Sequence, residues 1–175
     1  GGNAADAAVT VQLILGLVEP QSSGIGGGGF AIYYDKRERR IINYDGREKA
    51  PKKINPKVFQ NENGHSKKFY DAVLGGNSVG VPGLVDMLYK IHSDYGISSW
   101  NKVVEPAINL AENGFYPPNR LLKSLKKEKY LWRMKGNNDF FQQINDNPEK
   151  EVQNHNYAQT LRVISNNYRD FYEGS

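Results

Sequence analysis

Apolar residues recur every three to four positions over Leu84–Tyr95 and Trp100–Glu112, which is the spacing of one face of a helix. Two further helices are expected over Pro118–Tyr130 and Tyr157–Tyr168. Residues 135–156 are polar, rich in asparagine, and carry only weak structural signals. The second half of the chain is therefore predicted to be mainly helical.

The N-terminal segment Asn3–Val18 predicts a buried helix, because apolar side chains surround most of its circumference. Asn3 is a favourable N-cap, and the carboxylate of Asp6 complements the positive start of the helix. Glu19-Pro20 is expected to end this helix.

Short β-rich segments follow the first helix. Phe30–Tyr34 and Arg40–Tyr44 are separated by the charged segment Asp35–Arg39, which predicts a β-hairpin. Phe69–Leu74 is expected to add a short strand, and the polar residues 52–68 are expected to be mostly loop. The first half of the chain is therefore predicted to combine one helix with β-structure.

Length and composition narrow the class of protein. The 175 residues predict one domain, residues 1–175, with a sizeable core and no internal boundary or repeat. The absence of cysteine excludes disulfides, thiolate metal sites and a cysteine nucleophile. His65, His92 and His155 lie far apart in sequence, so no metal site is expected. We expect neither a membrane span nor a signal peptide within these residues.

The net charge of +4 arises from basic residues that are mixed with acidic ones, as on a solvated surface. A nucleic-acid site would require basic residues interleaved with stacking aromatics on one face. Tyr130 and Trp132 beside Arg133 and Lys135 give the only hint of such a face. We therefore expect no nucleic-acid partner.

The six residues 24–29 match the G-x-G-x-x-G spacing of dinucleotide-binding loops. That function requires a strand before the loop and a helix after it. Here a predicted helix precedes the loop and a predicted strand follows it. We therefore expect a tight loop whose glycines let a helix and a strand approach closely.

Residues 76–80 match the G-x-S-x-G pattern of a nucleophile elbow, with Ser78 as the nucleophile. In an elbow the helix begins directly after the serine. Val81-Pro82 keeps the chain extended, so the predicted helix begins several residues too late. A small serine hydrolase using Ser78 is therefore kept as a minor alternative.

The tetrapeptide Asp45-Gly46-Arg47-Glu48 is expected to turn at Asp45-Gly46 after the second predicted strand. An arginine in this position can direct its guanidinium at the carboxylate of a ligand. Arg47 can instead form an ion pair with Asp45 or Glu48, and spacing alone favours that ion pair.

Eight short segments occur in order along nearly the whole chain. They are Gly1–Ala8, Glu19–Phe30, Asp45–Pro51, Ser78–Gly83, Tyr95-Gly96, Glu105–Ala107, Glu112–Phe115 and Phe171–Gly174. Together they resemble the gamma-glutamyltranspeptidase family. Each motif is weak by itself, but this many in the same order are highly specific.

The resemblance implies an α+β protein with the N-terminal-nucleophile hydrolase fold, a four-layer αββα sandwich of which this chain is a partial fragment. Members of that family cleave themselves into a large and a small subunit. The new N-terminal threonine of the small subunit attacks the gamma-glutamyl carbonyl of glutathione or a similar amide. The acyl group then passes to water or to an amino acid, and no metal or organic cofactor is implied.

Carried over residue by residue, the resemblance assigns one substrate contact, Arg47, which would bind the α-carboxylate of the gamma-glutamyl group. The threonines Thr10 and Thr160 do not stand in the family's Thr-Thr-His processing sequence, which is absent. No catalytic residue is therefore expected in this chain, and the chain alone is expected to be inactive. A truncated, non-catalytic gene product is the alternative.

The resemblance also implies partners and a location. Glutathione or other gamma-glutamyl compounds are the expected ligands, and a small subunit that carries the nucleophile is the expected protein partner. A periplasmic or extracellular location is implied as well.

Overall fold

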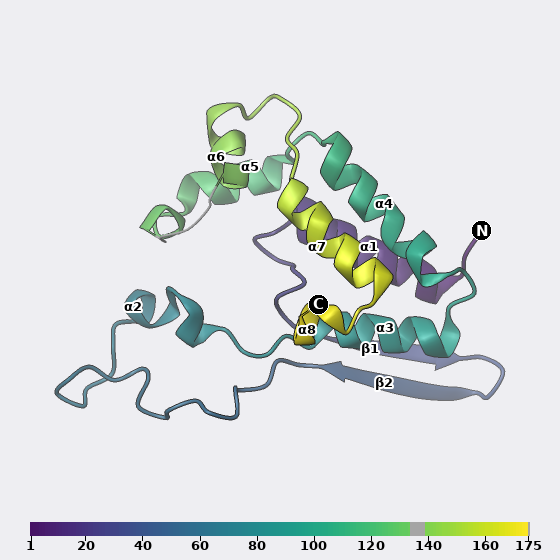
Figure 1. Ribbon diagram of the computed structural model, residues 1–175, viewed down its shortest axis with the longest axis horizontal. Coiled ribbons are helices and arrows are strands. Elements are labelled where there is room, and N and C mark those ends of the chain that lie inside the picture. Colours follow the sequence, from purple (N-terminus) through teal and green to yellow (C-terminus); the bar gives the residue numbers. More distant parts are fainter. Residues whose placement is uncertain (134–138, 175) are drawn as a thin grey trace.

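Figure 1 shows the computed structural model of the protein, which describes residues 1–133 and 139–174. In chain order its elements are α1 (Ala4–Val18), β1 (Gly29–Asp35), β2 (Arg40–Gly46), α2 (Phe69–Val73), the 3-10 helix η1 (Gly76–Ser78), α3 (Leu84–Tyr95), α4 (Trp100–Asn113), α5 (Asn119–Lys127), the 3-10 helix η2 (Leu131–Arg133), α6 (Asp139–Asp146), α7 (His155–Asn166) and α8 (Asp170–Glu173). The sheet within the described residues is a two-stranded hairpin.

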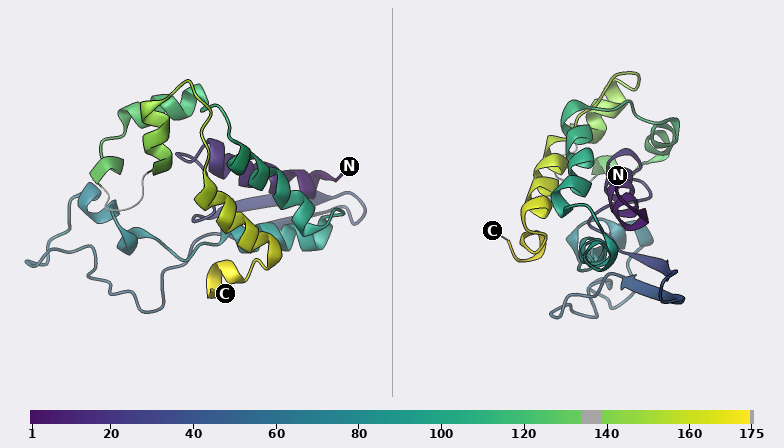
Figure 2. Two further views of the ribbon diagram at one scale, coloured as in Figure 1. Left: turned by 45° about the horizontal axis from the view of Figure 1, so that its top comes forward. Right: turned by 90° about the vertical axis from the view of Figure 1, so that its right-hand side faces the viewer.

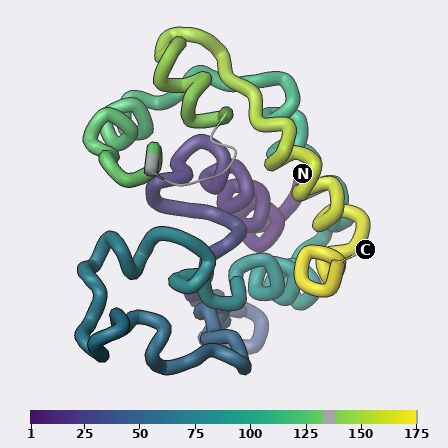
Figure 3. The backbone as a smooth tube through the Cα atoms, turned by 60° about the vertical axis from the view of Figure 1, so that its left-hand side comes forward, coloured from purple at the N-terminus to yellow at the C-terminus, as the bar shows by residue number. Residues whose placement is uncertain are grey.

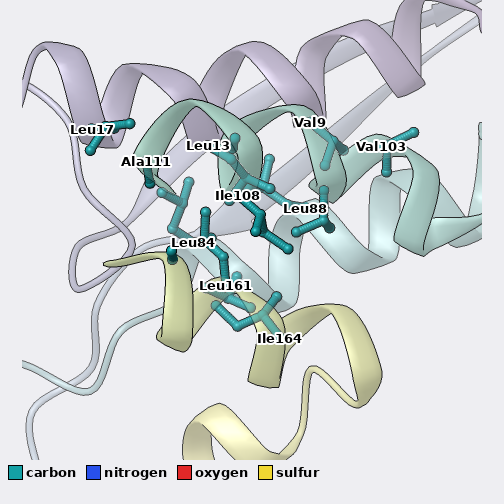
Figure 4. Packing of buried hydrophobic residues seen from close by; sticks show 14 of the residues in the cluster. Val9, Leu13, Leu17, Leu84, Leu88, Val103, Ile108, Ala111, Leu161 and Ile164 are labelled. Atoms are coloured by element: carbon teal, nitrogen blue, oxygen red, sulfur yellow. The ribbon is translucent and has the colours of Figure 1, made fainter. Parts of the chain in front are cut away.

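Four helices build the hydrophobic core. α4 packs against α1 and α7, and α3 packs against α1. The side chains at their contacts are apolar and buried, and Figure 4 shows them converging from all four helices: Val9, Leu13, Leu84, Leu88, Val103, Ile108, Leu161 and Ile164. The helices predicted from spacing over Leu84–Tyr95 and over Trp100–Glu112 are confirmed.

Helix α1 begins as its sequence predicts. The Asn3 side chain accepts hydrogen bonds from the backbone N–H of Ala5 and Asp6 at 2.9 and 3.1 Å. In return the Asp6 carboxylate accepts from the Asn3 N–H at 2.9 Å. These reciprocal bonds form a capping box and satisfy backbone donors that the first turn leaves unpaired.

Burial of α1 is one-sided, so the prediction of a helix buried all round is wrong. Leu13 is 1% exposed on the face that meets α3 and α4, whereas Val11 is 53% exposed. The sequence pattern indicates apolar residues around the helix, but the described part of the chain covers only one side of it. The other side presents apolar surface to solvent.

The Asp6 carboxylate is a charged group buried beside the core, and only 4% of the residue is exposed. It accepts weak hydrogen bonds from the backbone N–H of Ile97 and Ser98, and His92 Nε2 lies 3.5 Å from Asp6 Oδ1. Burial by itself raises the pKa of Asp6. The N–H donors of Asn3, Ile97 and Ser98 and the nearby His92 outweigh burial and lower the pKa below its ordinary value.

The predicted hairpin is confirmed. β1 and β2 pair antiparallel from Gly29 opposite Gly46 to Asp35 opposite Arg40. The expected turn at Asp45-Gly46 is wrong, because both residues continue β2 and pair with Phe30 and Gly29. The chain therefore leaves the sheet only at Arg47, after the residues expected to form the turn.

One face of the hairpin packs on α3, as the end-on view of Figure 2 shows. The Tyr33 ring stacks on the Tyr95 ring with centroids 4.1 Å apart. The Tyr44 hydroxyl donates to Asp94 Oδ2 at 2.8 Å. The opposite face is exposed. It carries the apolar side chains of Phe30, Ile32, Tyr34 and Ile41, together with the polar residues Asn43 and Asp45.

Residues 47–83 extend away from the helical core between β2 and α3 (Figure 1). The prediction of a strand over Phe69–Leu74 is wrong, because α2 occupies Phe69–Val73. Asp71 in its first turn favours a helix, and the hairpin offers this distant segment no strand to pair with. β-rich composition did not suffice without a partner strand.

The C-terminal third differs from its prediction in detail. Residues 135–138 lie outside the described residues, but α6 (Asp139–Asp146) forms where only weak structure was expected. Ile144 of α6 is fully buried, so packing stabilises this polar helix. α5 is shorter than the predicted Pro118–Tyr130. α7 begins two residues earlier than predicted because the Asn154 side chain caps it by accepting from the Tyr157 N–H at 3.0 Å.

Candidate substrate-binding site

Arg47 is the first residue beyond β2. Its backbone N–H donates to Asp45 Oδ1 at 2.9 Å, which fixes the direction in which the chain leaves the sheet. Its side chain is 71% exposed, and Nε lies 3.5 Å from Glu48 Oε2. An ion pair so exposed contributes little stability and can open easily. The pairing with Glu48 that spacing suggested therefore exists, but it leaves the guanidinium available to a ligand.

Two glycine-rich turns hold the backbone around Arg47. Lys49 and Val81 exchange both backbone hydrogen bonds, at 3.2 and 2.8 Å. The N–H groups of Gly83 and Leu84 donate to the Gly27 carbonyl at 3.1 and 3.2 Å. Loops that are far apart in sequence, 24–29 and 80–83, therefore meet on either side of the Arg47 segment.

Glycine is required where these loops touch. A Cβ at Gly28 would lie 2.4 Å from the Gly46 carbonyl oxygen, and a Cβ at Gly83 would lie 2.3 Å from the same atom. Both distances are well inside van der Waals contact, so a side chain would push the backbones apart. The expectation of a tight loop that allows close approach is confirmed. The order of α1, loop and β1 also departs from a dinucleotide-binding unit.

Glu48 fills the space between the two turns. Its carboxylate lies against Gly27 and Gly28, and its Cβ lies against Gly80, where any added side chain would clash with it. The sequence suggested Glu48 only as an ion-pair partner. Its position between the two glycine turns depends on contacts between distant segments, which spacing along the chain does not reveal.

A pocket of about 330 Å³ lies beside Arg47. Its walls come from three stretches of the chain: residues 45–49, residues 81–86 and the C-terminal residues 168–173. Arg47, Lys49 and Arg169 supply positive charge, and Asp45, Asp86 and Glu173 supply negative charge. A pocket of both signs suits a small zwitterion with an ammonium and a carboxylate group.

The C-terminal wall was missed by sequence reasoning. The Tyr172 hydroxyl accepts a hydrogen bond from the Asp86 N–H at 3.0 Å and so ties α8 to the first turn of α3. Burial raises the pKa of Tyr172. The motif Phe171–Gly174 was recognised for its order along the chain, but nothing in the sequence placed it next to Arg47.

Ser78 does not form a nucleophile elbow. It ends η1, six residues before α3 begins, and its hydroxyl donates to the backbone carbonyls of Val73 and Gly75 at 2.5 and 3.0 Å. The threonine hydroxyls are bound in a similar way: Thr10 Oγ1 donates to the Val103 carbonyl and Thr160 Oγ1 to the Asn156 carbonyl. These contacts are those of structural side chains.

Residues 1–133 and 139–174 contain neither a cluster of metal ligands nor a helix that could span a membrane. No three His, Asp or Glu side chains among them are grouped so that they could hold a metal ion. None of the helices in this part of the chain is both long and apolar enough to cross a bilayer. Of the residues that hinted at nucleic acid, Tyr130 stacks on Tyr70, and Lys135 lies outside the described residues.

The sequence model of one family, described as Gamma-glutamyltranspeptidase, matches residues 1–175. The chain belongs to the gamma-glutamyltranspeptidase family. A relative from Bacillus subtilis (strain 168), "Glutathione hydrolase proenzyme", is 44% identical over 115 residues, which are 66% of this chain and 20% of the relative. "Glutathione hydrolase 3" of Arabidopsis thaliana is 40% identical over 119 residues, which are 67% of this chain and 18% of the relative.

Solved structures of gamma-glutamyltranspeptidases share the fold. The enzyme from Pseudomonas nitroreducens, complexed with L-DON, superposes with a TM-score of 0.90 at 32% identity. The alignment covers 100% of this chain and 51% of that enzyme's chain. The Helicobacter pylori enzyme superposes with a TM-score of 0.89 at 28% identity, and the alignment covers 100% of this chain and 51% of that enzyme's chain. The predicted α+β class and N-terminal-nucleophile hydrolase fold are confirmed. The chain spans about a fifth of the curated relatives and about half of these solved chains.

Proposed function

We propose that this chain is part of the large subunit of a glutathione hydrolase or gamma-glutamyltransferase, in which Arg47 binds the α-carboxylate of the gamma-glutamyl group. The observation that carries the proposal is the combination of an anchored backbone at Arg47 and an exposed guanidinium whose ion pair with Glu48 can open easily. A carboxylate needs a cation of fixed direction, and the guanidinium offers two parallel N–H donors. The mixed charges of the adjacent pocket suit an amino-acid-like group.

The reaction itself we assign to a small subunit. Its N-terminal threonine would attack the gamma-glutamyl carbonyl and release the amine, and water or an amino acid would then take the acyl group. Arg47 would hold the substrate's α-carboxylate so that the carbonyl meets the hydroxyl in a reactive geometry. No step requires a bound cofactor, and the chain alone would not turn over glutathione.

The small subunit would cover the outer face of the hairpin. Phe30, Ile32, Tyr34 and Ile41 form an apolar stripe there, and Ile32 is 75% exposed. Exposed apolar faces of this kind mark interaction surfaces, and the unpaired edges of a two-stranded sheet invite further strands. On this proposal residues 1–175 form one partial domain that a partner completes, in an enzyme located in the periplasm or outside the cell.

The decisive experiment compares Arg47→Lys with the wild type in the full-length, self-processed protein. Loss of a bidentate, charge-assisted contact costs about 2–5 kcal/mol where the bound substrate shields the pair from water. We therefore expect kcat/KM for a gamma-glutamyl anilide to fall by at least about 30-fold. Self-cleavage should persist, because it involves no substrate carboxylate.

The control is Arg37→Lys, which makes the same replacement at an exposed position in the hairpin turn. It should leave kcat/KM unchanged. If Arg47→Lys also leaves kcat/KM unchanged while Glu48→Gln destabilises the fold, Arg47 is a structural ion-pair member and the proposed assignment is wrong.

A further inference from the structure

The positive charge of the chain is concentrated in two segments. Residues 49–73 and 119–132 contain eleven of the 23 basic residues but only three of the 19 acidic ones, a net charge of +8. The remaining residues carry twelve basic and sixteen acidic side chains, a net charge of −4. The modest total of +4 therefore hides a strong separation of charge, and the expectation that basic residues are mixed with acidic ones is wrong for these two segments.

The two basic segments meet at one place in the fold. The Tyr70 ring of α2 stacks on the Tyr130 ring after α5, with centroids 3.5 Å apart and an interplanar angle of 10°. An apolar pocket of about 300 Å³ lies where the segments meet, lined by Tyr70, Val73 and Leu74 on one side and by Leu121 and Leu125 on the other. Figure 3 shows both segments on the same side of the molecule. We call residues 49–73 and 119–132 together the basic end.

The charges of the basic end are directed to solvent. Lys52, Lys53, Lys126 and Lys127 are exposed, and none of these four lies in an ion pair within the described part of the chain. Glu128 Oε1 accepts hydrogen bonds from the backbone N–H of Tyr130 and Leu131, and no ion pair joins Glu128 to a lysine among the described residues. The surface therefore presents uncompensated lysines.

Exposed apolar side chains also occur in the basic end, two of them directly after a lysine. Ile54 follows Lys53 and is 38% exposed, and Phe69 follows Lys68 and is 71% exposed. Phe59 and Trp132 are exposed at about 40%. A soluble polyanion gains little from such apolar groups. The interface of a lipid bilayer takes both kinds, since lysines meet anionic headgroups while aromatic rings enter the acyl boundary.

We propose that the basic end binds the surface of an anionic phospholipid bilayer. The lysines contact the headgroups, and Phe69, Ile54 and Trp132 enter the interfacial region. The acidic remainder of the chain is repelled by the same surface, so the protein is oriented with the basic end towards the lipid. This attachment is peripheral and requires no helix that spans the membrane.

Co-flotation of the purified protein with vesicles tests the proposal, with any small subunit that accompanies the chain left in place. Binding is expected to phosphatidylcholine vesicles that contain phosphatidylglycerol and not to phosphatidylcholine alone. Lys52→Glu with Lys53→Glu, and separately Lys126→Glu with Lys127→Glu, should each weaken binding at least about 10-fold, since each lysine near an anionic surface contributes substantially. Lys36→Glu with Arg37→Glu makes the same change of charge in the hairpin turn and should have no effect.

A second variant separates lipid from other anions. Phe69→Ser, made at an exposed position, should remove the binding that persists at high salt and leave the salt-sensitive part in place. Absence of binding to the anionic vesicles overturns the proposal. Equal binding to soluble poly-glutamate or heparin, dependent on the same lysines but indifferent to Phe69, also overturns it in favour of a soluble polyanion. Neither result bears on Arg47 or on turnover.

Discussion

The helical core and the hairpin side of this molecule use apolar residues in opposite ways. In the core, α1, α3, α4 and α7 cover one another, and Leu161 and Ile164 are fully buried. On the outer face of the hairpin, Phe30 and Ile32 point into solvent although their strands are regular. The core helices cover one another within this chain, whereas the outer face of the hairpin is left exposed, and we propose that a partner covers it.

Truncation in the core should give the largest effect on stability. Leu161→Ala would leave a cavity between α7 and α4, and such changes cost about 2–5 kcal/mol of unfolding free energy. Urea denaturation followed by circular dichroism measures this loss. Val163→Ala, on the exposed side of the same helix, is the matched control and should stay within about 0.5 kcal/mol of wild type. Equal losses in the two variants would mean that α7 does not pack as described.

Asp6→Asn should have an intermediate effect at neutral pH. The variant keeps the shape but weakens the bonds from Asn3, Ile97 and Ser98, and we expect a loss of about 1–3 kcal/mol. Because folding lowers the pKa of Asp6, its carboxylate stabilises the fold at pH values above the unfolded pKa of about 3.9. That contribution is lost as the pH falls through the lowered folded pKa.

The measurement is the urea midpoint of wild type and Asp6→Asn between about pH 7 and pH 2, where the two curves should converge on the acid side. Glu62→Gln, an exposed carboxylate of the loop, is the control and should follow the wild type. A constant difference across the whole range would show that Asp6 acts through packing and not through its charge.

Ile32→Ser should have the smallest effect on the chain itself, within about 0.5 kcal/mol, because the side chain already meets water. The same substitution should lower the yield of associated subunits in the complete enzyme, measured by gel filtration after self-processing. A loss of stability in the chain as large as that of Leu161→Ala would abolish the distinction between core and hairpin. An unchanged yield would show that the partner binds a surface other than the outer face of the hairpin.

Local patterns predicted the elements that rest on local physics. The spacing within Leu84–Tyr95 specifies α3, the charged turn after Asp35 specifies the hairpin, and Asn3 with Asp6 specifies the start of α1. The strand expected at Phe69–Leu74 failed because β-rich composition requires a partner strand, which lies outside the local sequence. α6 was missed because the burial of Ile144, not helix propensity, stabilises it.

The features of the site likewise divide into those that local sequence predicted and those that depend on distant contacts. Arg47 was found from its place in a motif, and its role as a substrate contact stays a prediction. The position of Glu48 between Gly28 and Gly80 was not foreseen, and neither was the contact of Tyr172 with Asp86. Both features join residues that are far apart in the chain. They follow from how the helices pack, which no single segment of sequence encodes.

The contact between Tyr172 and Asp86 also joins walls of the pocket that the ribosome makes at different times. The ribosome makes the wall at residues 168–173 about 120 residues after the wall at residues 45–49. At roughly 5–20 residues per second, this interval lasts on the order of ten seconds. The hairpin, α1, α3 and α4 emerge first and can pack before α8 exists. α8 is made directly after the core helix α7 and docks onto α3, which has emerged earlier. A ribosome that stalls just before residue 168 would therefore leave the Arg47 pocket open on one side.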